Sequence, residues 1–181
     1  MQPPRICFLL ALAAVSFAAS PVRAHVTLEH PAALASSHYK ATFKVGHGCG
    51  ASPTRQFIVH MPEGVRGARP MPKPGWDLQI ERGPLAQPHE SHGRRITEDV
   101  QRITWTARTP ADMLLNAHYD EFVLQAQLPA KAGPMYWPVS QVCPEGRLGW
   151  HETPSAAQPA RELKSPAPLL DILPASGGHT H

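Results

Sequence analysis

The sequence is poor in charge and, after its first 24 residues, in long apolar runs. Charged residues make up 17% of the chain, and the 17 Lys and Arg exceed the 14 Asp and Glu by only three. Two of the basic residues, Arg5 and Arg23, lie in the first 24 residues, so the remainder is nearly neutral. This balance excludes the basic surface of a protein that binds nucleic acid or an anionic membrane. No later apolar run approaches the roughly 18 residues of a membrane-spanning helix.

Helical periodicity and the common catalytic motifs are also lacking. No long segment shows a 3.6-residue hydrophobic period, and the chain contains 21 prolines. Because proline breaks helix interiors, a bundle of long helices is excluded. The sequence has no Gly-x-Ser-x-Gly, Walker, dinucleotide-binding or His-Glu-x-x-His motif, and no carboxylates spaced as an acid–base pair. We therefore expect a protein that is not an enzyme.

Residues 1–24 are typical of an export signal. A short basic start precedes 14 apolar residues (6–19), and Val22-Arg23-Ala24 provides the small residues of a cleavage site. Cleavage after Ala24 would make His25 the amino terminus of a periplasmic protein. The alternative is an uncleaved N-terminal anchor, although 14 apolar residues are short for a membrane span.

The cysteine count fits an exported protein. Cys7 leaves with the signal, so Cys49 and Cys143 remain as an even pair. In an oxidising compartment such a pair predicts a disulfide, which would contribute about 4–5 kcal/mol in the chain-entropy model. The alternative is that both thiols bind a metal.

Short segments of alternating polar and apolar residues recur after residue 25. They predict an all-β fold: a single antiparallel β-sandwich of the cupredoxin-like or immunoglobulin-like kind, spanning residues 25–173. Glu98-Asp99 is expected to be a hairpin turn, residues 111–115 a helical turn, and residues 153–168 a linker or extended edge. The segments expected to be strands are 38–45, 56–61, 77–81, 95–97, 100–106, 121–128, 136–143, 148–152 and 169–173.

Histidine is abundant, and His25 is the most informative of the 11 histidines. Once exposed by cleavage, it offers its α-amino group and its imidazole, which together close a chelate ring around one metal ion. The amine has a reference pKa near 8, so a metal competes easily with its proton. Nitrogen ligands in a tetragonal plane suit Cu(II). The alternative is a signal cleavage site that merely happens to precede a histidine.

His47 is the second candidate ligand. It lies in a glycine-rich loop two residues before Cys49, so the predicted disulfide would hold it near Cys143. In contrast, Met61 and Met71 are expected to pack in or beside the core rather than bind Cu(I), and His179 and His181 form a loose pair in the flexible tail, residues 174–181. The disulfide would gather at one end of the fold His47, Glu145, Trp150, His151 and Glu152.

Seven motifs, in order, carry a resemblance to a known family. They are 24–27 (AHVT), 47–54 (HGCGASPT), 62–65 (PEGV), 71–76 (MPKPGW), 119–122 (YDEF), 136–143 (YWPVSQVC) and 146–150 (GRLGW). The chain resembles the YcnI-like family over nearly its whole length after the signal. The resemblance implies an exported bacterial β-sandwich that binds Cu(II) through a single-histidine brace at its processed amino terminus, with a carboxylate ligand and a tryptophan beside the metal.

The resemblance also implies the remaining site residues. The carboxylate should come from residues 46–54, but this loop contains no Asp or Glu, and His47 is its only strong ligand. We therefore expect a two-histidine site of His25 and His47 with Trp150 beside the copper. Members of the family are associated with copper-handling genes, so a copper carrier or chaperone with periplasmic or membrane copper-handling partners is expected. Two alternatives are a copper-dependent oxygenase and a structural or adhesive module without metal.

Overall fold

The computed structural model describes residues 25–91 and 93–175. The predicted signal, residues 1–24, and the tail histidines His179 and His181 lie outside the described residues. The strands are β1 (Thr27–Leu28), β2 (Ala32–Leu34), β3 (His38–Val45), β4 (Gln56–His60), β5 (Arg66–Pro70), β6 (Trp76–Ser91), β7 (Arg94–Ala107), β8 (Asp120–Gln127), β9 (Gly133–Tyr136), β10 (Val139–Val142), β11 (Arg147–Trp150) and β12 (Leu169–Leu173). Two short 3-10 turns lie in the connections: η1 (Pro110–Asp112) between β7 and β8, and η2 (Ala160–Glu162) between β11 and β12.

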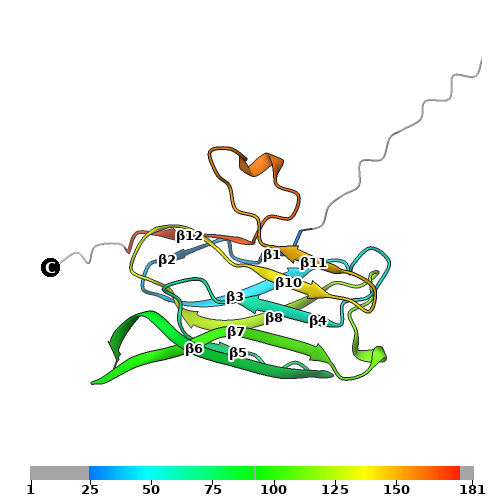
Figure 1. The fold of residues 1–181 in the computed structure, drawn as a ribbon, viewed down its shortest axis with the longest axis horizontal. Helices are drawn as coiled ribbons and strands as arrows, with labels where there is room; N and C mark the ends of the chain where they lie inside the picture. Colours follow the sequence, from blue (N-terminus) through cyan, green and yellow to red (C-terminus); the bar gives the residue numbers. More distant parts are fainter. Residues whose placement is uncertain (1–24, 92, 176–181) are drawn as a thin grey trace, which may run out of the picture.

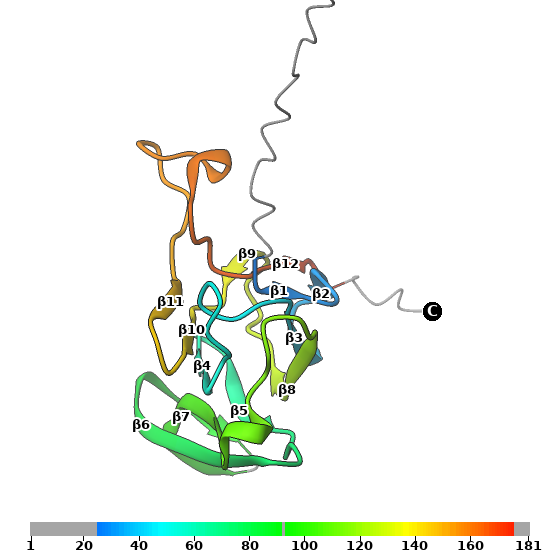
Figure 2. The same cartoon turned by 90° about the vertical axis from the view of Figure 1, so that its right-hand side faces the viewer.

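The strands form a β-sandwich with a small third sheet. One sheet has the order β1-β3-β8-β5, the facing sheet has the order β11-β10-β4-β7-β6, and the third has the order β2-β12-β9. Figure 1 shows the layered strands, and Figure 2 shows the β11-to-β6 sheet beside the β3–β8 pair. All pairings between these strands are antiparallel except β2–β12, which is parallel. The predicted fold class, a single antiparallel β-sandwich, is confirmed.

Large aromatic side chains fill the space between the two main sheets. Phe57 of β4 stacks on Phe122 of β8 with ring centroids 4.3 Å apart, which joins the sheets directly. Trp105 and Trp137 are completely buried, and Trp76 is nearly so, which places these three tryptophans in the core. Burial of side chains this large supplies much of the hydrophobic stabilisation of a small sandwich.

The predicted hairpin turn at Glu98-Asp99 is wrong. Strands β6 and β7 form one long hairpin, in which Trp76 lies opposite Ala107 at one end and Ser91 lies opposite Arg94 at the other. Glu98-Asp99 therefore lies inside β7. The buried Asp99 carboxylate accepts hydrogen bonds from the Gly67 and Val100 backbone N–H groups. These tertiary partners make the acidic residue compatible with a strand, whereas its sequence context indicated a turn.

The predicted strand 136–143 is divided in two. Strand β9 ends at Tyr136, and β10 starts at Val139. Pro138 has no backbone N–H to donate, and the backbone N–H of Trp137 donates to the Pro168 carbonyl. As a result β9 pairs with β12, while β10 pairs with β4 in the five-stranded sheet. The change of sheet carries the chain from the small sheet to the strands that hold Cys143 and Trp150.

Three strands have no counterpart among the predicted segments: β1, β2 and β5. They are short or contain glycine and proline, and therefore lack a clear alternation of polar and apolar residues. The predicted helical turn is present as η1, one residue earlier than expected. The predicted linker 153–168 forms a projecting loop (Figure 1) whose base is held by the Glu152 carboxylate, which accepts hydrogen bonds from the Lys164 and Ser165 backbone.

Candidate metal centre

The register of β1 and β3 brings His25 to the loop that contains His47. Thr27 faces Lys44 and Leu28 faces Phe43, so the same register continued by two residues sets His25 opposite Gly46. His47 follows immediately in the loop after β3. A very short strand at the start of the described chain therefore places two histidines, distant in sequence, at one end of the sandwich.

Trp150 lies against both histidines. The centroid of its ring system is 5.6 Å from that of His25 and 5.9 Å from that of His47. Trp150 is only 4% exposed, whereas His25 and His47 are half-buried. The structure thus brings together the three residues that the sequence singled out, although they come from the segment before β1, the β3–β4 loop and β11.

Gln141 of β10 holds this arrangement and was missed by the sequence analysis. Its completely buried side chain accepts a 2.7 Å hydrogen bond from the Trp150 indole through Oε1. Its Nε2 donates to the His47 carbonyl at 2.8 Å and to the Thr54 hydroxyl at 3.0 Å. One amide therefore fixes both the tryptophan and the histidine loop. The available signal was the alternation of Gln141 with the inward-facing Val139, which places a polar residue at an inward position.

The predicted disulfide is present and fixes the histidine loop to β10. Cys49 and Cys143 are bonded across 94 residues, with Cα atoms 6.1 Å apart. The loop is further closed by backbone hydrogen bonds between Cys49 and Ser52, and the Gly48 N–H donates to the Asn116 side chain. A loop tied at these points loses little conformational entropy when His47 binds a ligand, because most of it is already ordered.

A short hydrogen bond sets the tautomer of His47. Its Nδ1 lies 2.6 Å from the Gly48 carbonyl, an acceptor, so Nδ1 carries the proton and donates it. In a neutral imidazole this leaves the lone pair on Nε2. Metal-binding histidines commonly donate one ring N–H to a backbone carbonyl in this way, which orients the other nitrogen toward the metal.

Gly48 is required by the close approach of the loop to itself. A Cβ at this position would lie 2.0 Å from the Ser52 carbonyl oxygen, far inside contact distance. We expect Gly48→Ala to cost about 1–3 kcal/mol of stability, as overpacking does, and to lower Tm by several degrees in a thermal melt. The matched control is Gly50→Asn, because Gly50 has φ 66° with open space around it. An equal Tm for Gly48→Ala and the wild type would contradict this role.

In the described residues, one ring nitrogen of His25 is left without a polar partner. Its Nε2 is buried and has no hydrogen-bond partner in the part of the chain that the structure describes. A buried polar atom without a partner costs about 1–3 kcal/mol, so the ring is positioned by packing against Trp150 rather than by a hydrogen bond at that atom. A metal bound through the α-nitrogen and Nδ1 would supply the polar interaction that fixes the ring.

The donor set is small. Among residues 25–91 and 93–175, no three His, Cys, Asp or Glu side chains form a cluster that could hold a metal. With His25 and His47 as the two side-chain donors, a third strong ligand has to come from elsewhere. The backbone nitrogen of His25 becomes such a ligand when the preceding peptide bond is cleaved, because an amide nitrogen is converted to an amine.

The other residues expected at this end of the fold do not join the two histidines. His151 follows Trp150 and, as alternation in a strand requires, points to the opposite face, where Ser140 hydrogen-bonds its Nε2 and His60 contacts its ring. Glu152 is occupied by the loop that it closes. Met61 packs against the core, as predicted, whereas Met71 is 53% exposed. Glu145 lies beside the histidine loop, where its N–H donates to the Ser52 hydroxyl. His151 and Glu152 directly follow Trp150, but the side chains of these two bind other partners than the two histidines.

His60 and His151 form a separate pair on the outer face of the five-stranded sheet. Their ring centroids are 5.8 Å apart. Burial lowers the pKa of His60 below its usual value, and the nearby His151, Arg102 and Arg147 lower it further. Glu81, the ion-pair partner of Arg102, opposes these contributions and raises the pKa of His60.

Comparison with known proteins places the chain in a family. Residues 25–172 match the sequence profile described as "Domain of unknown function (DUF1775)". The chain belongs to the DUF1775 family. This is the YcnI-like family that the sequence motifs resemble, and the match begins at His25.

A solved structure supports the fold of this DUF1775 domain. It is titled "Crystal structure of an uncharacterized protein from Nocardia farcinica reveals an immunoglobulin-like fold", and it aligns with a TM-score of 0.63 at 25% identity. The alignment covers 82% of this chain and 97% of that chain. No curated protein sequence matches the chain. In the described residues of this DUF1775 protein, no helix has the length and apolar character needed to cross a membrane.

Proposed function

We propose that this DUF1775 protein is an exported, periplasmic Cu(II)-binding protein that carries copper rather than catalysing a reaction. Its ligands are the α-amine and imidazole of His25 and the imidazole of His47, with Trp150 packed beside the metal. The observation that carries the proposal is the packing of two half-buried histidines against one buried indole. The centroid of each imidazole lies within 6 Å of the centroid of the Trp150 indole, which Gln141 holds in place.

The chemistry of three nitrogen donors selects the metal. Cu(II) is the first-row divalent ion that such ligands bind most strongly, and it accepts nitrogen ligands in a tetragonal plane. Two neutral imidazoles and a neutral amine leave the positive charge of the ion uncompensated at the site. We expect this to permit release to a partner with anionic or thiolate ligands, as a carrier requires.

The surroundings of the site fit transfer as well as binding. Both imidazoles are half-buried, so a partner can reach the metal from one side while Trp150 covers the other. The disulfide is typical of an oxidising compartment such as the periplasm. The proposed partners are other copper-handling proteins of the periplasm or the membrane.

Tryptophan fluorescence tests copper binding at this location. Adding Cu(II) to the processed protein should quench fluorescence with a 1:1 end point, because the paramagnetic ion would lie close to Trp150. In Trp150→Phe most of the copper-dependent quenching should disappear, while affinity measured by competition with a chelator stays within a few-fold.

Trp105→Phe provides the matched control, because Trp105 is completely buried between the sheets and contacts neither histidine. This variant should keep the copper-dependent quenching. Quenching that persists unchanged in Trp150→Phe would show that the copper binds elsewhere on the protein.

A further inference from the structure

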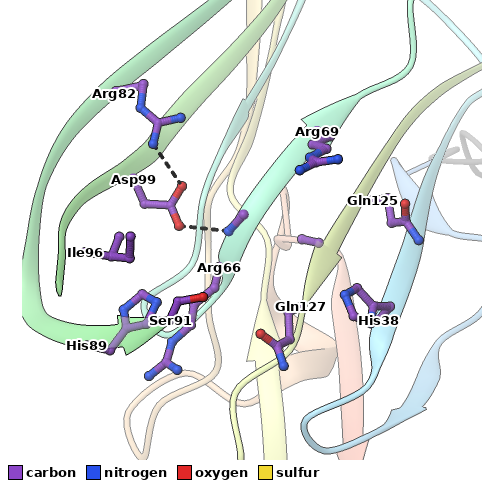
Figure 3. A pocket seen from close by; sticks show the side chains of 12 residues that line it. His38, Arg66, Arg69, Arg82, His89, Ser91, Ile96, Asp99, Gln125 and Gln127 are labelled. Atoms are coloured by element: carbon purple, nitrogen blue, oxygen red, sulfur yellow. Dashed lines mark hydrogen bonds and ion pairs between the residues drawn. The ribbon is translucent and has the colours of Figure 1, made fainter. Parts of the chain in front are cut away.

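A second concave site lies away from the two histidines. It is a cavity of about 420 Å³ between the outer face of the β3-β8-β5 sheet and the part of the β6–β7 hairpin that lies toward its turn (Figure 3). We call it the arginine pocket, after its most prominent lining residues. They are Arg66, Arg69 and Arg82, accompanied by His38 and His89. None of the residues proposed to bind copper lines it.

A bulge in β5 places two of these arginines on the same face. Arg66 lies opposite Gln127, and Arg69 lies opposite Gln125. A step of three residues along β5 therefore matches a step of only two residues along β8. In a regular strand, residues three apart point to opposite faces. The extra residue at the bulge, where Gly67 has φ 58°, turns both arginines toward the pocket.

The single acidic side chain that lines the pocket already has partners on both oxygens. One Asp99 oxygen accepts from the Gly67 N–H at 2.8 Å, and the other accepts from the Val100 N–H at 2.8 Å. Arg82 lies 3.8 Å from Asp99 and points toward it in Figure 3. Arg66 and Arg69 make no ion pair with any described residue. Three arginines against one aspartate leave the lining with an excess of two positive charges.

Neutral donors complete the lining. Ser91, Gln125 and Gln127 present hydroxyl and amide groups to the cavity. The Nδ1 atom of His89 is buried and has no hydrogen-bond partner in the described residues. A buried nitrogen without a partner is costly, and a ligand in the adjoining cavity could satisfy it.

We infer that the arginine pocket binds a small polyanion carrying at least two phosphate or carboxylate groups. The guanidinium fork matches both groups with paired hydrogen bonds, and two arginines without a carboxylate partner are available to different groups of one ligand. A volume of about 420 Å³ lies within the range of small-molecule sites. The inference does not depend on copper binding, because the two sites share no residue.

Isothermal titration with two probes tests the inference on copper-free protein, since both probes chelate copper. Pyrophosphate represents phosphate ligands and citrate represents carboxylate ligands. We expect at least one to bind with a 1:1 stoichiometry and a Kd below about 1 mM at low ionic strength. Arg66→Gln/Arg69→Gln should weaken that binding at least tenfold, without a change in Tm because both side chains are exposed.

Arg55→Gln/Arg147→Gln is the matched control, because it removes the same charge from two exposed arginines that do not line the pocket. It should leave the Kd within about twofold. An equal loss in both double variants would overturn the inference, because binding would then follow net charge alone. The inference would also be overturned if neither pyrophosphate nor citrate binds, even if a long acidic peptide does bind.

Discussion

A protein that retains one extra glycine before His25 should bind Cu(II) at least a hundredfold more weakly than the processed protein. The addition keeps every side chain but converts the α-amine into an amide, which binds a metal only after losing its proton. The chelate between that nitrogen and the imidazole is lost. A hundredfold change corresponds to about 2.8 kcal/mol, at about 1.4 kcal/mol per tenfold. Competition titration against a chelator of known affinity measures it.

His47→Ala in the processed protein is the companion variant. It should cost less than the added glycine, because two of the three nitrogens remain on His25. Binding by both proteins should weaken as the pH falls, because protons compete with the metal for the imidazole and amine nitrogens. Equal affinity with and without the extra glycine would place the metal elsewhere and remove the histidine brace from the account.

Removing the disulfide should produce the largest loss of stability. We expect Cys49→Ala/Cys143→Ala to lower the free energy of unfolding by about 4 kcal/mol, because a bridge across 94 residues strongly restricts the unfolded chain. Copper binding should weaken as well, since the loop that carries His47 loses its connection to β10. Urea unfolding, followed by circular dichroism, measures the first effect.

Reduction of the wild-type protein provides the control for stability. It should lower the urea midpoint by about as much as the double substitution does, and the double variant itself should be insensitive to reductant. Copper affinity is compared in the absence of reductant, because thiols bind and reduce Cu(II). An unchanged urea midpoint in both the reduced protein and the variant would contradict a stabilising role for the bridge.

Local pattern was sufficient to predict the regular strands and part of the site. The alternation over 38–45 marks β3 to the residue, because every second residue, from Tyr39 to Val45, is buried in the core. The predicted strand 169–173 likewise coincides with β12. The even cysteine pair was enough to predict the disulfide. The chelating chemistry of His25, the position of His47 beside the predicted disulfide and the family resemblance singled out both histidines, and the structure brings both to Trp150.

Features that depend on tertiary partners could not be predicted in this way. Asp99 resembles a turn residue until the Gly67 N–H is placed against its carboxylate. Gln141 shows only its inward position in the sequence, and its role depends on three partners from the β3–β4 loop and β11. Arg66 and Arg69 share a face only because of a β-bulge, which their spacing in the sequence does not predict. In each case the decisive partner is distant in sequence.

Native mass spectrometry of the protein recovered from the exported fraction tests the central claim most directly. The account predicts a chain that begins at His25, lacks two hydrogens because Cys49 and Cys143 are bridged, and carries one copper ion when copper is supplied. Denaturation should release the copper and leave the same starting residue. A protein that begins at another residue and still holds one copper ion tightly would contradict the account.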